Sequence, residues 1–406
     1  MVDQQAAAQC AKLCDSFYLY DERSLTRSAQ TLRDSFPGID FLYSVKCNPH
    51  PLIIKALAEK GFGADAASLG EVLLSRECGL APEDIYYSAP GKTPEDLARA
   101  VDLSTVIADS PGEVERLQAL AQSRGITLKI GVRINPDFTL YTANGSSSKF
   151  GIDEETVFSL LPTWNALPNI RIVGLHVHCH SQELDAAILR RYHENVLALA
   201  RRFSAGLATP LDFVNLGSGI GVPFTAQDRP VDVAALGKST SALAAAFQKE
   251  FPGVRVLIES GRYATSAAGT YMSKVVDKKV SRGKTYVLLA STLNAFLRPA
   301  VNHMVEGQNP GKAPDACEPL YTGGGTVEFL PLTQTQERET VTLCGSLCTA
   351  ADIVAEDISL PRLSVGDLVA IPNAGSYAYV LSPTQFAHLP LPRQFFICST
   401  GQILES

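Results

Sequence analysis

The chain has 406 residues, of which 46% are apolar and 19% charged, so it is long enough for two domains with sizeable hydrophobic cores. Its formal net charge of −7 argues against non-specific binding to nucleic acid or to an anionic membrane. We expect neither a signal peptide nor a membrane span, and the nine scattered cysteines are typical of free thiols, so the cytoplasm is the predicted location.

The first predicted elements are a short strand at 17–20 and a helix over 24–36. After them, apolar or β-branched runs alternate with helical patterns. The runs lie at about 40–46, 63–67, 85–89, 105–109, 127–134, 170–178, 212–216 and 254–259. The helical patterns lie at 52–60, 69–78, 111–123, 184–204 and 231–251. Eight such units over roughly 220 residues predict a (β/α)8 barrel, with a doubly wound sheet as the alternative.

The alternation stops after Gly261. From there, predicted strands separated by Gly and Pro turns lie at 270–280, 285–291, 325–332, 339–344, 367–372 and 376–381, with few helical patterns. We therefore predict an α/β protein with a (β/α)8 barrel over residues 25–268. A mainly antiparallel β domain is predicted from residues 1–24 and 269–406, into which the strand at 17–20 pairs.

Active sites of such barrels lie at the C-terminal ends of the strands. The polar residues predicted there are Lys46, Asp65, Arg133, His178, Gly217 to Gly219, and Glu259 with Arg262. Lys46 stands in Phe-Leu-Tyr-Ser-Val-Lys-Cys-Asn-Pro (41–49), at the predicted tip of the first strand. A desolvated lysine amine is a nucleophile suited to a Schiff base; the alternative is a lysine whose amine reaches water.

Two glycine-bearing segments are candidates for an anionic ligand. Gly217-Ser218-Gly219 follows the seventh predicted strand, where barrels often bind phosphate, although tight turns also need glycine. Glu259-Ser260-Gly261-Arg262 ends the eighth. Its carboxylate is suited to a protonated ring nitrogen and its arginine to phosphate, or the two form an internal ion pair.

Three histidines form a rival signal. His176, His178 and His180 alternate on a predicted strand, so their side chains are expected on one face. Such a set is suited to zinc, which would make the protein a metal-dependent hydrolase. Stacking on a cofactor ring would need only one of the three.

The β domain carries two further motifs. Cys348 and Asp352 lie four residues apart, a spacing suited to proton transfer and substrate binding, or to a thiol beside a helix cap. Tyr377 follows Gly375-Ser376, which is either a simple turn or a phenol that contacts phosphate.

Together these residues resemble the fold-type III pyridoxal-phosphate decarboxylases, the family of ornithine and diaminopimelate decarboxylases, over nearly the whole chain. The resemblance implies an alanine-racemase-like barrel, pyridoxal 5'-phosphate as cofactor, no metal, and a homodimer with shared active sites. It implies that Lys46 carries the cofactor and that Cys348 crosses the dimer interface as proton donor. The further cofactor contacts that it implies are Asp65, Arg133, His178, Ser181, Gly217, Ser218, Gly219, Glu259, Gly261, Arg262 and Tyr377.

Two departures from the family pattern bear on the substrate. Members that act on basic amino acids follow the cysteine with Asp or Glu, whereas this chain has Thr349. The missing charge-assisted contact is commonly worth on the order of 1.5–3 kcal/mol, so the substrate side chain is not expected to end in a bare ammonium. The Leu-Cys-Thr-x-x-Asp form is similar to decarboxylases of amino-acid conjugates in vibrioferrin and staphyloferrin B pathways, and to one acting on a carrier-bound glutamyl group. His180 stands where diaminopimelate decarboxylases usually have Gly.

The resemblance thus implies an α-decarboxylase for a citryl-serine or citryl-diaminopropionate intermediate of carboxylate siderophore biosynthesis. The implied substrate contacts are Arg298, Thr349, Asp352 and His180. Diaminopimelate, ornithine or lysine is the alternative substrate, and an amino-acid racemase shares the barrel and the lysine. From other classes, the zinc hydrolase and a non-catalytic cofactor carrier stay open.

Overall fold

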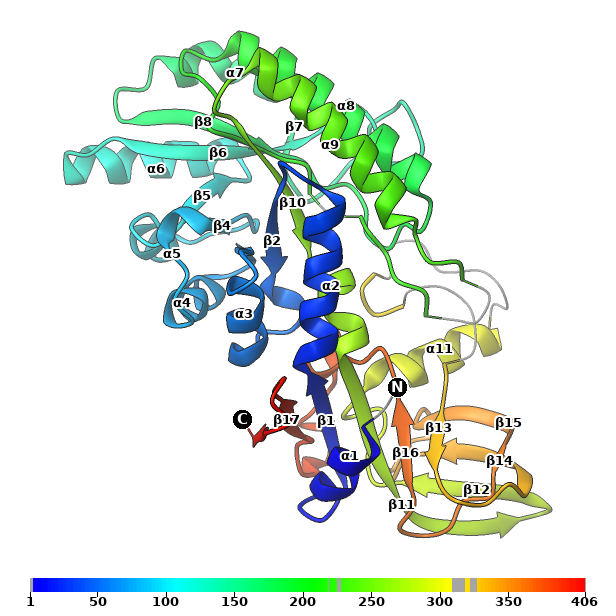
Figure 1. Cartoon of the computed structure of the whole chain (residues 1–406). Coiled ribbons are helices and arrows are strands. Elements are labelled where there is room, and N and C mark those ends of the chain that lie inside the picture. Colours follow the sequence, from blue (N-terminus) through cyan, green and yellow to red (C-terminus); the bar gives the residue numbers. More distant parts are fainter. Residues whose placement is uncertain (1–2, 218, 225–227, 309–317, 322–326, 406) are drawn as a thin grey trace. The chain divides into compact units, whose positions relative to one another are not determined.

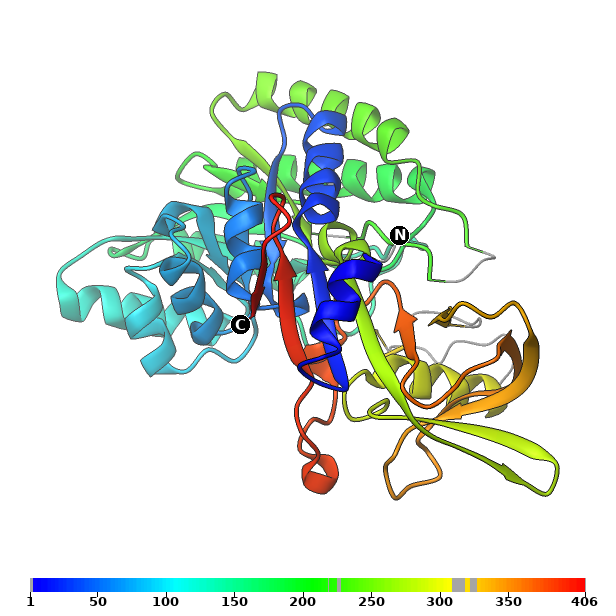
Figure 2. The same cartoon turned by 60° about the horizontal axis from the view of Figure 1, so that its bottom comes forward.

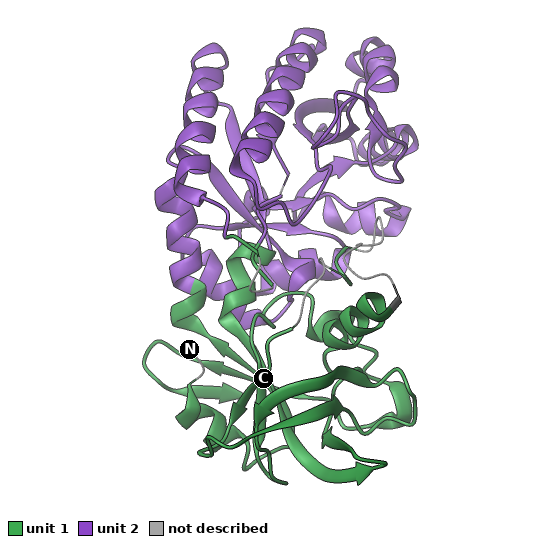
Figure 3. Ribbon diagram, turned by 90° about the vertical axis from the view of Figure 1, so that its right-hand side faces the viewer, with its two compact units in different colours: residues 1–25, 222–229, 262–406 green, residues 26–221, 230–261 purple. Residues whose placement is uncertain are grey.

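The computed structural model describes residues 3–217, 219–224, 228–308, 318–321 and 327–405. The chain divides into two compact units, shown in different colours in Figure 3. Residues 26–221 and 230–261 form the first, which we call the barrel unit. Residues 1–25, 222–229 and 262–406 form the second, which we call the β unit.

The barrel unit is built on eight parallel strands that close on themselves (Figure 1). They are β2 (Asp40–Ser44), β3 (Gly63–Ala66), β4 (Ile85–Tyr87), β5 (Thr105–Ala108), β6 (Leu128–Asn135), β8 (Ile170–His176), β9 (Phe213–Asn215) and β10 (Arg255–Ser260). The pairing order is β5-β4-β3-β2-β10-β9-β8-β6, and β5 pairs with β6 to complete the ring. A two-residue strand, β7 (Ile152–Asp153), adds to the end of β6. The predicted (β/α)8 barrel is confirmed.

Helices alternate with the strands around the barrel, and the first of them precedes β2. They are α2 (Glu22–Ser35), α3 (Pro51–Ala58), α4 (Leu69–Glu77), α5 (Pro94–Ala100), α6 (Pro111–Arg124), α7 (Glu154–Asn165), α8 (Ala186–Gly206) and α9 (Val233–Glu250). Side-chain caps fix where several begin: Ser68 accepts a hydrogen bond from the Glu71 amide, and Ser110 accepts one from the Glu113 amide. Both capping serines lie just beyond the C-terminal end of a barrel strand, the region where functional residues of such barrels lie.

The middle of the barrel is filled by a cluster of buried side chains that includes Phe213 and Tyr86. Phe213 packs with side chains from the other strands, and its ring lies 5.0 Å from that of Tyr86. Gly131 and Gly174 make room for it, because a Cβ at Gly131 would stand 2.7 Å from the Phe213 ring and one at Gly174 would overlap it. The barrel is thus a packed core, and polar side chains are left to its rim.

The β unit contains a curved, mainly antiparallel sheet. Its strands are β1 (Ser16–Asp21), β11 (Gly269–Ser281), β12 (Lys284–Leu289), β13 (Leu330–Leu332), β14 (Arg338–Cys344), β15 (Ile353–Pro361), β16 (Leu368–Ile371), β17 (Arg393–Ile397) and β18 (Ile403–Glu405). The order is β15-β14-β12-β11-β1-β17-β18, with β16 paired to β11 and to β13. Its helices are α1 (Gln4–Cys10), α10 (Arg262–Thr265) and α11 (Leu297–Gln308).

The N-terminal strand is central to this sheet. β1 runs antiparallel to β11 and parallel to β17, so the first and last parts of the chain lie side by side (Figure 2). The expectation that this strand pairs into the β domain is confirmed. Its apolar face, with Phe17 and Leu19, joins a core that also contains Met272 and Phe395. The sheet therefore depends on residues far apart in sequence.

One predicted strand is wrong. Residues 376–381 form a turn and a 3-10 helix (Tyr379–Leu381), and Tyr377 has a φ of 52°, which is incompatible with an extended strand. Within the described ranges, no helix has the length and apolarity needed to cross a membrane.

Candidate active site

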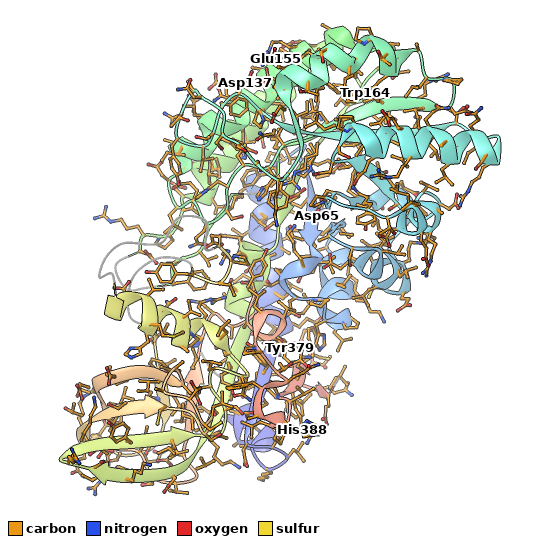
Figure 4. All side chains as sticks on the ribbon, turned by 180° about the vertical axis from the view of Figure 1, so that it is seen from behind. Asp65, Asp137, Glu155, Trp164, Tyr379 and His388 are labelled. Carbon is orange, nitrogen blue, oxygen red and sulfur yellow. The ribbon has the colours of Figure 1, made fainter. Side chains whose placement is uncertain are left out.

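Lys46 lies just beyond the first barrel strand. β2 ends at Ser44, so Lys46 stands in a 3-10 turn (Val45–Cys47) and not at the strand tip, which corrects the predicted strand end. Its Nζ is 2.6 Å from Oδ2 of Asp65, and 41% of its side chain is exposed. Asp65 comes from β3, is completely buried, and is labelled in Figure 4. The amine therefore has a fixed anionic neighbour and an open side.

A second strand end fixes the other oxygen of this carboxylate. Ser88, directly after β4, donates a hydrogen bond of 2.6 Å from Oγ to Oδ1 of Asp65. Arg133, from β6, donates to the Ser88 carbonyl at 3.4 Å and lies 3.8 Å from Oδ1 of Asp109. Lys46, Asp65, Ser88, Arg133 and Asp109 thus form one polar arc across five neighbouring strands.

Glu259 is a second buried carboxylate at the barrel rim. It lies in β10 and is 2% exposed. The side chain of Asn215 donates to its Oε1 at 2.9 Å, and Nε2 of His176 is 3.0 Å from the same oxygen. Burial alone would raise the pKa of Glu259, but its interactions with neighbouring His176 and Lys46 lower it well below its usual value. The site therefore holds a buried anion.

The three histidines do not share one strand face. β8 ends at His176, and the two others follow it in irregular chain, which corrects the predicted alternation. Nε2 of His178 is 3.4 Å from Oγ of Ser181, and Nε2 of His180 is 3.3 Å from Oη of Tyr141. Burial lowers the pKa of His178 to about 3 and also lowers that of His180, so both rings are neutral near pH 7.

The positions of the three histidines do not match the zinc site that the sequence offered as an alternative. In the part of the chain that the structure describes, no three His, Cys, Asp or Glu side chains are grouped so as to hold a metal ion. His176 faces Glu259, whereas His180 faces Tyr141 and lies beside Glu183, which accepts a 2.8 Å hydrogen bond from the same phenol. The imidazoles belong to different local networks.

The glycines that follow β9 and β10 lie where neighbouring segments of the chain pack too closely for a side chain. Gly217 has a φ of 71°, and a Cβ there would overlap the Val177 carbonyl oxygen. A Cβ at Gly219 would stand 2.6 Å from the Leu189 side chain, and one at Gly261 would stand 3.1 Å from Sγ of Cys47. Ser218 lies outside the described residues. These glycines allow close packing of the rim segments, and the amide of Gly217 itself donates to Oδ1 of Asn215 at 2.9 Å.

The β unit supplies a cationic cluster. Arg262, directly after the last barrel strand, forms an ion pair with Glu318, and its buried NH1 has no hydrogen-bond partner among the described residues. Its guanidinium lies 5.0 Å from the ring of Tyr377. Arg298, at the start of α11, donates to the carbonyls of Asn373 and Ser376, and burial with the Arg262 charge lowers its pKa to about 9. An orphaned buried donor of this kind fits an anionic group such as a phosphate.

The Cys348 segment follows β14. The Cys348 side chain is exposed and Thr349 is half-buried. Asp352 is 2% exposed, and its carboxylate accepts hydrogen bonds from the amides of Leu293 and Leu347 and from the hydroxyl of Thr292. A substrate contact by Asp352, as the sequence predicts, would compete with these bonds.

The predicted site residues thus fall in both units. Those in the barrel unit are Lys46, Asp65, Arg133, His178, His180, Ser181, Gly217, Gly219, Glu259 and Gly261, and those in the β unit are Arg262, Arg298, Cys348, Thr349, Asp352 and Tyr377. Sequence reasoning missed Ser88 and Asp109. Both directly follow barrel strands, so the strand-end rule applied to the third and fourth strands would have found them.

A closed (β/α)8 barrel with a lysine just beyond its first strand, a buried strand-end carboxylate and glycines at the rim is suited to an enzyme that holds a phosphate-bearing cofactor. Residues 22–266 match the family described as "Pyridoxal-dependent decarboxylase, pyridoxal binding domain". The chain belongs to this family and is a pyridoxal-phosphate-dependent decarboxylase, which overturns the hydrolase alternative. The lysine, the lowered pKa of Glu259 and the orphaned Arg262 donor fit that cofactor.

Curated relatives span nearly the whole chain. It is 29% identical over 387 residues to an L-glutamyl-[BtrI acyl-carrier protein] decarboxylase of Niallia circulans, covering 93% of this chain and 87% of the relative. It is 27% identical to a 2-[(L-alanin-3-ylcarbamoyl)methyl]-2-hydroxybutanedioate decarboxylase of Staphylococcus aureus, covering 99% and 98%. Diaminopimelate decarboxylase of Helicobacter pylori, solved with L-lysine, has the same fold, with a TM-score of 0.81 at 24% identity over 96% of this chain and 93% of that one.

Proposed function

We propose that this decarboxylase acts on an α-amino acid whose side-chain end is conjugated, of the citryl-serine or citryl-diaminopropionate type found in carboxylate siderophore assembly. The observation that carries the proposal is the segment after Cys348. Thr349 offers a hydroxyl in place of a carboxylate, and the nearest acid in sequence, Asp352, is occupied by three hydrogen bonds. An ammonium at the substrate tail would find no free counter-charge among these residues.

The relatives support a conjugate. The Staphylococcus aureus enzyme is named for an alanine unit joined through its side chain to a citrate-like acid, and the Niallia circulans enzyme for a carrier-bound glutamyl group. Neither substrate ends in a free side-chain amine. Diaminopimelate decarboxylases are also among the relatives, at 27% identity for that of Aquifex aeolicus, so a diamino acid is the second candidate substrate.

We assign the cofactor contacts as follows. Lys46 would hold the cofactor, and the anion of Glu259 would keep its ring nitrogen protonated. The contacts to the phosphate are Ser181, Gly217, Gly219, Gly261, Arg262 and Tyr377. When bound, pyridoxal phosphate supplies an electron sink for the pair released with carbon dioxide.

The remaining roles belong to side chains around the reacting carbon. His178, a neutral imidazole, would contact the face of the bound cofactor, and Cys348 of a second subunit would supply the proton that replaces the carboxylate. His180 contacts the substrate tail. Because its pKa is lowered, it offers a neutral N–H and not a charge, so it binds a citryl oxygen through a hydrogen bond. The eight cysteines that the structure describes are free, which supports a reducing compartment such as the cytoplasm.

The test is release of carbon dioxide from a panel of citryl-diaminopropionate, citryl-serine, diaminopimelate, ornithine and lysine. We expect the citryl conjugates to be turned over and the free diamino acids to be poor substrates. A Thr349→Asp variant is expected to gain activity toward ornithine or lysine and to lose it toward the conjugates, whereas Thr349→Ser, the matched control, is expected to keep the wild-type preference. Wild-type preference for diaminopimelate or a basic amino acid would overturn the proposal.

A further inference from the structure

The carboxylate beside Lys46 is itself held in place. Asp65 is fully buried, so its two oxygens meet only protein groups or a bound ligand. Oδ2 faces the Lys46 amine at 2.6 Å, and Oδ1 accepts the Ser88 hydroxyl at 2.6 Å. A carboxylate can rotate about its last side-chain bond at little cost, so one oxygen must be fixed for the other to keep its direction.

Ser88 is well placed to fix it. The residue is 6% exposed and its backbone is held on both sides, by a hydrogen bond from its amide to the Ala66 carbonyl at 3.2 Å and by the Arg133 donor on its own carbonyl at 3.4 Å. A hydroxyl has a single hydrogen to donate, and here it is given to Asp65. The strand end after β4 therefore sets the direction of a carboxylate on β3.

We infer that Ser88 is a positioning residue for the cofactor lysine: through the Ser88–Asp65 hydrogen bond it aims the carboxylate that holds the Lys46 amine. This inference rests on the proposed role of Lys46. By this assignment Ser88 acts on the amine through Asp65.

The consequence is a tighter hold on the ammonium form of Lys46. A carboxylate at short distance raises the pKa of an amine by stabilising its ammonium form. This stabilisation is weaker when the carboxylate is free to rotate away from the amine. Other charged or titratable groups also act on Lys46, namely Glu71 from α4, Glu259 from β10 and His178 beyond β8. These groups are unchanged by a substitution at Ser88, so its effect can be measured against them.

The experiment uses Ser88→Ala in cofactor-free full-length protein. Lys46 is labelled with an amine-selective reagent at a series of pH values, and the labelled peptide is quantified by mass spectrometry. We expect the midpoint of the labelling profile to fall by about one pH unit, equivalent to a tenfold weaker hold on the ammonium. Added pyridoxal phosphate is captured on the protein and fixed by borohydride reduction, and the residue that carries it is identified by the same mass spectrometry.

Three further variants separate positioning from folding. Ser88→Thr keeps a hydroxyl and is expected to restore the wild-type midpoint. Ser104→Ala removes a different buried hydroxyl of the barrel unit, which donates to the Ala100 carbonyl at 3.0 Å, and is expected to leave the midpoint unchanged. If Ser88→Ala folds poorly, Ser88→Cys, with a weaker donor, is expected to give a smaller shift in the same direction.

The outcomes are distinct. A Ser88→Ala midpoint that is unchanged or higher, with or without a lower Tm, overturns the inference. If borohydride attaches the cofactor to a residue other than Lys46 in the wild type, the proposed role of Lys46 fails as well. Attachment at Lys46 with no shift in Ser88→Ala overturns the inference alone.

Discussion

At the scale of single residues, the barrel rim holds a buried carboxylate in its charged state. Glu259 has almost no contact with solvent, and a buried carboxyl group would ordinarily become neutral. The Asn215 amide donates to it and His176 lies beside it, so the charge is compensated locally. Such compensation explains why a group this deeply buried has a lowered pKa. In the role that we propose for Glu259, this stable anion would keep the ring nitrogen of the cofactor protonated.

The first prediction concerns this charge. Glu259→Gln keeps the size and one acceptor oxygen of the side chain but removes its charge, so we expect kcat to fall by roughly 10²–10³-fold, the scale for loss of one preorganised electrostatic contact. Cofactor trapped on Lys46 by borohydride is expected to persist. Glu154→Gln, at another buried carboxylate of the barrel unit, is the control and is expected to keep its kcat. An unchanged kcat in Glu259→Gln would contradict the proposed role.

At the scale of elements, Glu71 in the first turn of α4 is a partly buried carboxyl group whose ionised form is disfavoured. Ser68 caps the helix by accepting the Glu71 amide, and the Glu71 carboxylate reaches back to accept the Ala67 amide at 2.7 Å. Burial raises the pKa of Glu71 to about 7, against the opposing effects of the Ala67 hydrogen bond and the Lys46 charge. Ionising Glu71 in the folded protein therefore costs free energy.

The second prediction follows from the sign of that shift. The folded pKa of Glu71 lies above its unfolded value, so the wild type loses stability as the pH rises from about 4.5 to 7. Glu71→Gln keeps an acceptor for Ala67 but cannot ionise. From urea titration at pH 8, we expect its free energy of unfolding to exceed that of the wild type by on the order of 2 kcal/mol. This figure is smaller than the full pKa shift would give, because part of the Glu71 side chain reaches solvent and its interactions are screened there. At pH 4 the two are expected to unfold alike. A variant destabilised equally at both pH values would contradict this account.

Element boundaries show what could be predicted from the sequence. The eight barrel strands are continuous apolar runs because parallel strands are buried on both faces, and each predicted run overlaps an observed strand. α7 was missed because Pro162 stands inside it and suggests a helix break. β15 was missed because polar Glu356 and Asp357 interrupt its apolar residues, and Asp357 has a φ of 51°. Tertiary pairing with β14 outweighs that local signal.

In the candidate site, too, some residues could be predicted from the sequence pattern and others could not. The strand-end rule led to Lys46, Asp65 and Glu259 because rim positions follow from strand positions alone. The partners of these residues, such as Ser88 for Asp65, depend on which strands are neighbours and how their ends are staggered. Side-chain contacts of that kind are set by the barrel's register, which periodicity does not encode.

At the scale of the whole molecule, the two units contribute different parts of the proposed chemistry. The barrel unit holds Lys46 and Glu259, whereas the β unit holds Arg262 and Cys348. The family match covers residues 22–266 and thus the barrel, so the assignment of Cys348 rests on the segment beyond it. Cys348 is exposed on the single chain, in keeping with our proposal that it completes the site of a second copy.

The last prediction tests that proposal directly. A Lys46→Ala chain lacks the cofactor lysine, and a Cys348→Ala chain lacks the proton donor, so each alone is expected to have little activity. If each site combines Lys46 of one copy with Cys348 of the other, random mixing gives half mixed dimers, each with one intact site out of two. Coexpression is then expected to restore roughly a quarter of wild-type activity, as follows from a two-fold arrangement of equivalent sites.

The controls fix the interpretation of that experiment. Coexpression of Lys46→Ala with Lys46→Arg leaves every site without the lysine and is expected to restore nothing. A site built within one chain would leave every mixed dimer with two damaged sites, so coexpressed Lys46→Ala and Cys348→Ala would show only the average of their separate activities. That result would place both residues in the same subunit's site, or exclude Cys348 from the chemistry if Cys348→Ala alone kept its kcat.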